Sequence, residues 1–263
     1  MTQYMRCHIL PALGGKKMDA ITTPDVSTLM MLMLKKKQLK NGSVNKMLKI
    51  LRAAYYVAIK MKINGVKENP VVGIKQFPEE HMQRFLTKEE TKRLFIALEE
   101  YEKSKYLKYA VKFLLLTGAR VSEALSARWE EVDFIKKEWL IPETKSGKPR
   151  IIPIHKALEE LLLSIPSYKR SEFLFPSKMS PNGHLTTIKR QWDRIRKKVG
   201  LEDVRIHDLR HSFASTLVNN GCNLYEVQKL LGHHDLKMTQ RYAHLSDAAL
   251  QSAASLSEKI FEP

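Results

Sequence analysis

Two helices that each end at a glycine are predicted within residues 206–244, and they restrict the fold of this chain more than any other stretch does. His207, Arg210 and His211 open the first helix at spacings of three and four residues, so their side chains share one face. Apolar residues on the other faces can turn towards a core. Gly221 closes this helix, because glycine readily takes the left-handed conformation in which helices often end.

The second helix covers about residues 224–231 and ends at Gly232. His233 therefore lies just past a helix terminus, where its side chain is free to project into a cleft. Tyr242 follows nine positions later. Taken singly, a histidine beside a glycine is usually a loop residue, and a tyrosine in such a place is usually half-buried at the surface. Together with Arg210, these residues indicate a site that handles phosphate.

The spacing of His207 and His211 also matches a helical zinc site, with Asp208 where a metalloprotease would carry glutamate. Arg210 argues against that interpretation, because it would set a fixed cation on the same face as the metal. An arginine between two histidines suits an anionic phosphate instead. We therefore predict no metal site.

A second cluster, Thr117-Gly118-Ala119-Arg120-Val121-Ser122-Glu123, lies upstream. An apolar helix is predicted to end at Gly118, and a new helix opens with Arg120 and Glu123 in its first turn. Arg120 there offers a guanidinium to a phosphate oxygen, and Glu123 can hold that guanidinium still. An isolated pair of this kind is usually a solvated salt bridge, but the two clusters together favour a phosphate site.

The sequence resembles the tyrosine recombinases of the phage integrase family. Its motifs follow the family's order: Thr-Gly-Ala-Arg-x-x-Glu, a lysine in a hairpin, His-x-x-Arg-His, Leu-Gly-His and Tyr-x-His. The similarity is strong over residues 85–245 and weak in the N-terminal part. By this resemblance the catalytic set is Arg120, Lys145, His207, Arg210, His233 and Tyr242, with Glu123 as a supporting residue.

The resemblance implies a site-specific enzyme that cleaves and rejoins DNA strands through a 3′-phosphotyrosyl intermediate. Arg120 and Arg210 would meet the negative charge of the transition state, and Tyr242 would carry the DNA 3′ end. The two histidines of the set would add hydrogen bonds or accept the phenol proton, and its lysine would protonate the leaving 5′ oxygen. The phosphotyrosine bond keeps the energy of the cleaved linkage, so we expect neither a metal nor a nucleotide cofactor.

The net charge favours a polyanionic partner. The 263 residues include 45 Lys and Arg against 28 Asp and Glu, a formal net charge of +17, and neutralising phosphates releases counterions. A membrane surface is the rival partner, but the basic residues are spread along the chain and no apolar run reaches the roughly 18 residues of a spanning helix. We therefore predict binding to double-stranded DNA and no membrane association. Cys7 and Cys222 give no disulfide framework and the N-terminus lacks a signal-peptide pattern, so a cytoplasmic location is expected.

Residues 1–80 are predicted to form a small helical domain. One helix starts at Thr23-Pro24-Asp25, and a second is capped by Ser43 and ends at Asn64-Gly65. The basic face of the second helix is either a solvated surface or a DNA-binding one, and the uncompensated net charge favours DNA. The candidate DNA-binding residues on this helix are Lys46, Lys49 and Arg52.

The resemblance implies that residues 1–80 are the family's core-binding domain, which clamps the duplex opposite the catalytic domain. That domain usually begins with one more helix than residues 1–10 can provide. An incomplete N-terminal domain is therefore an open expectation.

Residues 81–263 are predicted to form the catalytic domain. A capping box at Thr87-Lys88-Glu89-Glu90 opens its first helix. Two short strands at residues 139–141 and 150–154 flank the hairpin that carries Lys145. The fold class is thus mainly α with a small β-sheet (α+β).

Four further basic residues of this domain are predicted to contact DNA phosphates. Lys148 and Arg150 belong to the hairpin. Arg190 and Arg194 belong to a helix over residues 185–199 that is rich in positive charge, and its basic side should face the DNA backbone.

A last helix is predicted beyond Tyr242, capped by Ser246-Asp247. It either packs on its own chain or docks elsewhere. The resemblance implies the second, since this family commonly passes its C-terminal segment to a neighbouring protomer. It also implies a homo-oligomer on DNA, with a tetrameric synapse.

Two other functions would use the same residues. A type IB topoisomerase-like enzyme would nick and close DNA without synapsis, so it would relax supercoils without exchanging partners between two sites. A non-catalytic DNA-binding protein would use the scaffold for binding alone. The complete catalytic set argues against the second of these.

Overall fold

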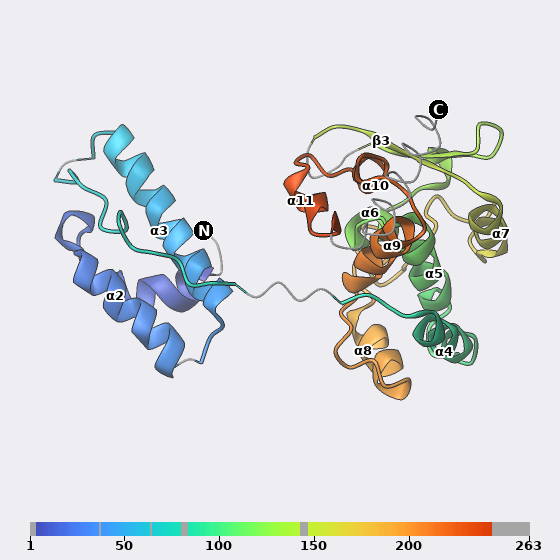
Figure 1. Ribbon diagram of the computed structural model, residues 1–263, viewed down its shortest axis with the longest axis horizontal. Helices are drawn as coiled ribbons and strands as arrows, with labels where there is room; N and C mark the ends of the chain where they lie inside the picture. The colour runs from blue at the N-terminus through green and yellow to red at the C-terminus, as the bar shows by residue number, and fades with distance from the viewer. Residues whose placement is uncertain (1–3, 37, 64, 80–83, 143–146, 244–263) are drawn as a thin grey trace, which may run out of the picture. The chain divides into compact units, whose positions relative to one another are not determined.

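The computed structural model describes residues 4–36, 38–63, 65–79, 84–142 and 147–243. The chain divides into two compact units, Met1–Met82 and Gln83–Pro263. Helices dominate both units, and the second also contains a three-stranded sheet (Figure 1). The predicted fold class, mainly α with a small β-sheet, is confirmed.

All regular secondary structure in the described part of the first unit is helical. In chain order it holds a π-helical turn at Met5–Ile9, α1 (Leu10–Leu13), a 3-10 turn at Met18–Ala20, α2 (Thr23–Met31), a second π-helical turn at Leu32–Lys36 and α3 (Asn41–Lys60). The capping residue of α2 is Thr22, one position before the predicted start, because Thr22 and Asp25 exchange side-chain-to-backbone hydrogen bonds.

The predicted limits of α3 were wrong at both ends. The helix begins at Asn41, so Ser43 lies within its first turn rather than at its cap. It ends at Lys60 instead of reaching Asn64-Gly65, because Lys62 turns to a φ of 53°. The backbone N–H of Ile63 then bonds back to the carbonyl of Ala58 at 3.0 Å.

The core of the first unit lies between α2 and α3. Val26 and Leu29 of α2 pack with Val44 and Leu48 of α3, all almost fully buried. Asn45 is buried as well, and its amide bonds to both the N–H and the carbonyl of Phe77, at 2.9 and 2.8 Å. The returning segment is thereby held against α3.

The second unit carries most of the elements. In chain order these are α4 (Lys88–Glu99), α5 (Leu107–Thr117), α6 (Val121–Leu125), a 3-10 turn at Trp129–Glu131, β1 (Val132–Asp133), β2 (Glu138–Ile141), β3 (Arg150–Pro153), α7 (Lys156–Ser164), α8 (Lys189–Lys198), α9 (Asp208–Asn219), α10 (Leu224–Leu231) and α11 (Lys237–Gln240). The predicted capping box of α4 is confirmed, with Thr87 and Glu90 as its two members. The predicted helix over residues 185–199 is shorter, since Thr187 caps the N–H of Lys189 with its hydroxyl at 3.1 Å.

The sheet is antiparallel in the order β1-β2-β3. Trp139 pairs with Ile152 across β2 and β3, and both side chains face the core. Residues alternate between the two faces of a strand, so Arg150 and Ile152 of β3 point inward while Ile151 and Pro153 point outward. Lys145 of the predicted hairpin lies outside the described residues.

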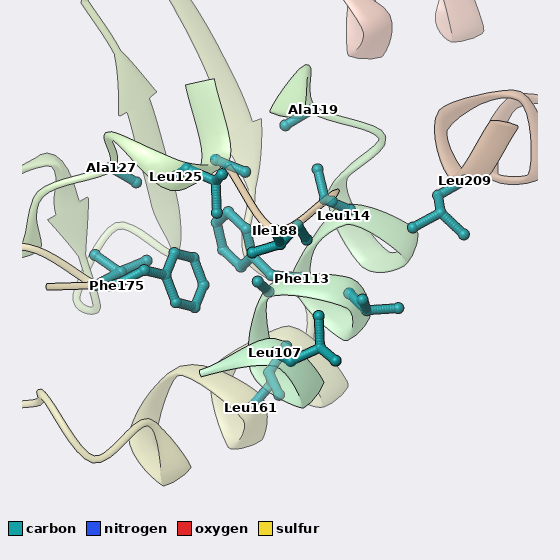
Figure 2. Packing of buried hydrophobic residues seen from close by; sticks show 14 of the residues in the cluster. Leu107, Phe113, Leu114, Ala119, Leu125, Ala127, Leu161, Phe175, Ile188 and Leu209 are labelled. Carbon is teal, nitrogen blue, oxygen red and sulfur yellow. The ribbon is translucent and has the colours of Figure 1, made fainter. Parts of the chain in front are cut away.

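The core of the second unit surrounds α5. Figure 2 shows Leu107, Phe113 and Leu114 of α5 among buried residues from other segments. The ring of Phe113 lies 4.8 Å from that of Trp139 and 5.9 Å from that of Phe175, so α5 joins the sheet to the loop before α8. No helix in the described ranges is both long and apolar enough to cross a membrane.

Candidate active site

A sharp corner between α5 and α6 positions Arg120. Gly118 ends α5 with a φ of 60°, and a Cβ there would lie 2.2 Å from a ring carbon of Phe213. Arg120 directly precedes α6, and its backbone N–H donates to the Glu123 carboxylate at 3.0 Å. Its Nη1 donates to the same carboxylate at 2.7 Å. Glu123, itself buried, thus fixes both the main chain and the guanidinium of Arg120.

Arg210 joins three helices through its guanidinium. It belongs to α9 and is almost fully buried. Its Nη1 donates to the carbonyl of Gly118 at 2.7 Å, and its Nη2 donates to the carbonyl of Leu231 at 2.6 Å. These carbonyls end α5 and α10, where helices leave acceptors without an intrahelical partner. Burial, and then the nearby charges of Arg120 and Arg150, lower the pKa of Arg210 to about 9, so it stays protonated at neutral pH.

Arg150 is an interior residue, which corrects the prediction that it contacts the DNA backbone from an exposed hairpin. It is 7% exposed because it occupies an inward position of β3. Its Nη2 donates to the Glu123 carboxylate at 2.7 Å, and its Nη1 donates to the carbonyl of Leu231. Burial lowers the pKa of Arg150, Glu123 opposes that shift, and Arg120 adds to it.

Positive charge exceeds negative charge in this cluster. Arg120 and Arg150 share the Glu123 carboxylate, whereas Arg210 is held by two carbonyl oxygens. A carbonyl satisfies a hydrogen-bond donor but does not cancel its charge. The cluster therefore favours an anion with several oxygen acceptors, such as a phosphodiester.

His233 lies just past the end of α10. Gly232 ends that helix with a φ of 63°, as predicted, and the main chain of His233 bonds to Gln228. Its Nδ1 lies 2.8 Å from the hydroxyl of Thr239, which is fully buried. Burial, and then the charges of Arg210 and Arg120, lower the pKa of His233 to about 3. The ring is therefore neutral at pH 7.

Tyr242 follows α11 and is 4% exposed. Its hydroxyl lies 2.5 Å from Nδ1 of His211, and the His211 ring stands edge-on to that of His207, with centroids 5.1 Å apart. Burial raises the pKa of Tyr242, although Arg241 and Arg210 oppose this shift. Burial lowers the pKa of His211 to about 4, with a further contribution from His207.

His207 differs from the other two histidines because it keeps an exposed edge. It is the residue that precedes α9 rather than a member of its first turn. Withdrawal of the rest of its ring from water, and the charge of Arg210, lower its pKa below the usual value. Of these three histidines, His207 is therefore the most exposed to solvent.

A groove of about 620 Å³ lies beside this cluster. Lys148 and Arg150 of the hairpin line one side, and Lys229, His233 and His234 from the end of α10 line another. Lys148 and Lys229 are both exposed residues and give the groove a basic rim. Lys145 belongs to the segment between β2 and β3, outside the described residues.

The remaining predicted DNA contacts are distributed over both units. Lys46 and Lys49 are exposed on α3, and Arg190 and Arg194 are exposed on α8. The structure corrects the prediction that Arg52 contacts DNA. Its side chain is half-buried and donates to the carbonyls of Val71 and Ile74 at 3.3 and 3.4 Å. It holds a loop against α3 rather than presenting an open cation to a partner.

One residue of the site, Thr239, was missed from the sequence, and it orients His233. His211 was predicted on the shared helix face but was left out of the catalytic set, and it holds the phenol of Tyr242. A signal for Thr239 was its position three residues before Tyr242, which places both on one face of a helical turn. No group of three His, Cys, Asp or Glu side chains suited to a metal ion occurs in the part of the chain that the structure describes.

Comparison with known sequences gives a consistent result. The sequence pattern of the phage integrase family matches residues 84–249. The integrase of Salmonella phage P22 is 31% identical over 204 residues, which are 73% of this chain and 51% of that protein. The integrase of Escherichia phage P2 is 32% identical over 219 residues, 83% of this chain and 60% of that protein. This chain therefore spans between half and two thirds of the length of these phage integrases.

This chain covers a larger share of some other relatives, among them a bacterial recombinase and a transposon integrase. The tyrosine recombinase XerC of Bacillus licheniformis is 30% identical over 255 residues, 90% of this chain and 81% of that protein. Among solved structures, the Tn1549 transposon integrase in complex with transposon right end DNA aligns with a TM-score of 0.77 at 22% identity, over 98% of this chain and 91% of that one. A lambda integrase dimer bound to a core site aligns with a TM-score of 0.72 at 22% identity, over 90% of each chain. The shared fold and the match over residues 84–249 establish that this chain belongs to the phage integrase family.

Proposed function

We propose that this chain is a tyrosine recombinase, which cleaves and rejoins double-stranded DNA at specific sites through a 3′-phosphotyrosyl intermediate. The observation that supports this best is the meeting of two buried or half-buried arginines, Arg120 and Arg210, with His233 and Tyr242 where α6, α9, α10 and α11 converge. This set combines a nucleophile, fixed positive charge and neutral hydrogen-bonding rings. Those are the groups that phosphoryl transfer without a metal requires.

Each group has a defined part in the proposed cleavage step. The hydroxyl oxygen of Tyr242 attacks the scissile phosphorus, a phosphorus–oxygen bond forms to the tyrosine, and the bond to the 5′ oxygen breaks. Arg120 and Arg210 stabilise the negative charge that builds on the non-bridging oxygens. Loss of one preorganised donor of this kind commonly costs about 2.7 to 4 kcal/mol of transition-state stabilisation. Attack by the freed 5′ hydroxyl of a second strand reverses the step and rejoins the DNA.

Two proton transfers accompany cleavage: a neutral histidine accepts the proton of Tyr242, and a lysine donates one to the leaving oxygen. Tyr242 is protonated at rest, because its pKa is raised, so a base must take its proton during attack. His207 and His233 are the proposed acceptors, since both are neutral at pH 7 and lie beside the arginines. Lys145 is proposed to protonate the leaving 5′ oxygen. We propose no metal or nucleotide cofactor, because the phosphotyrosine bond conserves the energy needed for rejoining.

DNA backbone contacts are proposed for exposed cations on both units: Lys46 and Lys49 on α3, Lys148 beside the groove, and Arg190 and Arg194 on α8. The Tn1549 and lambda integrases named above were solved with DNA, and the lambda enzyme as a dimer, which supports an assembly on DNA. A tetrameric synapse and action in the cytoplasm stay predictions.

The test is the trapping of a covalent protein–DNA adduct. Duplexes bound by the protein are first selected from a randomised pool, and nicked versions of them are then incubated with the full chain in EDTA without nucleotide. A nick just downstream of the cleavage point lets the short fragment that carries the freed 5′ hydroxyl diffuse away, so rejoining fails and the adduct accumulates. Denaturing gels report a protein band shifted by the attached DNA.

Two variants, one at the proposed nucleophile and one matched control, show whether an adduct depends on Tyr242. Tyr242→Phe is expected to bind DNA and form no adduct. Tyr225→Phe is the matched control, because Tyr225 is 62% exposed on α10 and carries the same substitution without touching the proposed chemistry. An adduct in Tyr242→Phe would contradict the proposed nucleophile. Relaxation of supercoils without exchange between two sites would favour the topoisomerase-like alternative.

A further inference from the structure

Arg150 makes contacts that the proposed mechanism does not use. It is the first residue of β3, 27 positions after Glu123 and 81 before Leu231, yet its guanidinium reaches both. Burial of a third cation beside Arg120 and Arg210 is unfavourable, as the lowered pKa of Arg150 indicates. The other residues of β3 are apolar, so the contacts of Arg150 must explain why a buried charge occupies this strand.

The contacts of Arg150 are shared with the two arginines that are proposed to bind phosphate. The Glu123 carboxylate accepts from Arg120 at 2.7 Å and from Arg150 at 2.7 Å. The carbonyl of Leu231 accepts from Arg210 at 2.6 Å and also from Arg150. A continuous chain of hydrogen bonds therefore runs from Arg120 through Glu123, Arg150 and Leu231 to Arg210.

We propose, on the basis of the function proposed above, that Arg150 is a positioning residue that holds the guanidiniums of Arg120 and Arg210 in fixed relation to each other. Arg120 precedes α6, and Arg210 projects from α9. From β3, Arg150 binds both the Glu123 carboxylate, which holds Arg120, and the Leu231 carbonyl, which holds Arg210. Because its planar fork directs two donors at a fixed angle, it can bind a carboxylate and a carbonyl together, which the single ammonium of lysine does less well.

Arg150 also supports the main chain from which His233 projects. A Cβ on Gly232 would lie 2.6 Å from Nη1 of Arg150 and 2.7 Å from its Cδ. The backbone at Gly232 thus rests directly on the Arg150 side chain. The same side chain therefore sets the places of two arginines and of the histidine that follows Gly232.

The experiment separates positioning from direct DNA binding, using the full chain with Arg150→Met and Arg150→Lys. Two quantities are measured on the same nicked duplex: the single-turnover rate of adduct formation at saturating DNA, and the dependence of binding on salt concentration. Arg150→Met is expected to lower the rate on the order of 100-fold, the size of effect that misplacement of catalytic groups produces. Arg150→Lys is expected to recover part of that loss, because it restores one donor and the charge.

DNA affinity and its salt slope are expected to stay at the wild-type values in both variants. Lys148→Met is the contrast, since a lost phosphate contact lowers the slope by about 0.9. The proposal is overturned if Arg150→Met keeps the wild-type rate, or if it loses affinity together with such a drop in slope, because Arg150 would then be a DNA contact.

A structural measurement decides the same question without the reaction. In a crystal structure of Arg150→Met, or of Arg150→Lys if the methionine variant does not fold, we expect the Arg120 and Arg210 guanidiniums to be displaced from their wild-type positions. Unchanged positions would refute the positioning role. Failure of the proposed function would look different, since the wild-type protein itself would then form no adduct while the displacement in the variant would remain measurable.

Discussion

Two half-buried histidines of the site, His211 and His233, are expected to make the second unit sensitive to mild acid. Burial lowers the pKa of His211 to about 4 and that of His233 to about 3. In the unfolded chain both rings recover an ordinary pKa near 6.5. Between about pH 4 and 6.5 the unfolded chain therefore binds more protons than the folded one. Stability from these groups is complete above that window and is lost as the pH falls through it.

The magnitude follows from the difference in proton binding. From pH 7 to pH 5, a histidine with a native pKa of about 4 or lower loses about 2 kcal/mol of stability. The pair would lose about 4 kcal/mol if both shifts were fully expressed. Because both rings are only partly withdrawn from water, we expect about 2 to 4 kcal/mol in total.

Urea unfolding followed by tryptophan fluorescence measures this loss. The three tryptophans, Trp129, Trp139 and Trp192, all belong to the second unit, so the signal reports that unit alone. The wild type is compared with a His211→Gln and His233→Gln double variant, whose rings cannot be protonated. Carboxylates that titrate in acid are common to both proteins and cancel in the comparison.

The wild type is expected to lose about 2 to 4 kcal/mol more than the double variant between pH 7 and pH 5. His234→Gln, at the exposed neighbouring position, controls for the substitution itself. Equal losses in the wild type and the double variant would refute the reasoning, because the histidines would then not be held neutral by burial in the folded state.

Two further predictions concern residues that shape the site. Gly118→Ala is expected to destabilise the second unit by about 3 kcal/mol in urea unfolding, because it combines a φ of 60° with a Cβ 2.2 Å from Phe213. Gly221→Ala, with φ of 89° and open space around it, should cost about 1 to 2 kcal/mol, and equal costs would contradict the steric argument. Thr239→Val is expected to slow adduct formation about tenfold at unchanged DNA affinity, since His233 loses its hydroxyl partner, whereas Thr239→Ser should keep the wild-type rate. A slow Thr239→Ser variant would show that packing, not the hydroxyl, is what matters.

Local signals in the sequence were enough to place the helices that frame the site. Gly118 and Gly232 both take left-handed conformations where helices were predicted to end. The Arg120–Glu123 pair forms as its spacing indicated, since both partners lie within one turn. Such features depend on residues a few positions apart, which is the range over which a single sequence is informative.

The predictions for two arginines failed because their partners are distant in the sequence. Arg52 was predicted to contact DNA from the basic face of its helix, and Arg150 from the hairpin. Both instead bind carbonyl groups far away in the sequence. For Arg150, the alternation of β3 was a usable signal, because it shares a face with the buried Ile152. The acceptors themselves, Glu123 and the carbonyl of Leu231, come together only through the packing of α6 and α10 beside the strand.

The arginines and the histidines of the site have different charge states at neutral pH. Its arginines stay charged, including Arg210 with its pKa of about 9, so they supply a positive field that does not depend on protonation near neutral pH. Its histidines are neutral chiefly because burial disfavours their charged form, and at His233 the charges of Arg210 and Arg120 add to that effect. Neutral imidazole is the form that accepts a proton, so the charge that attracts a phosphodiester also keeps the bases ready for Tyr242. Removal of Arg210 should therefore raise the pKa of His233. NMR titration of the His233 ring in Arg210→Met measures this change. An unchanged His233 pKa would contradict the proposed coupling between phosphate binding and proton transfer.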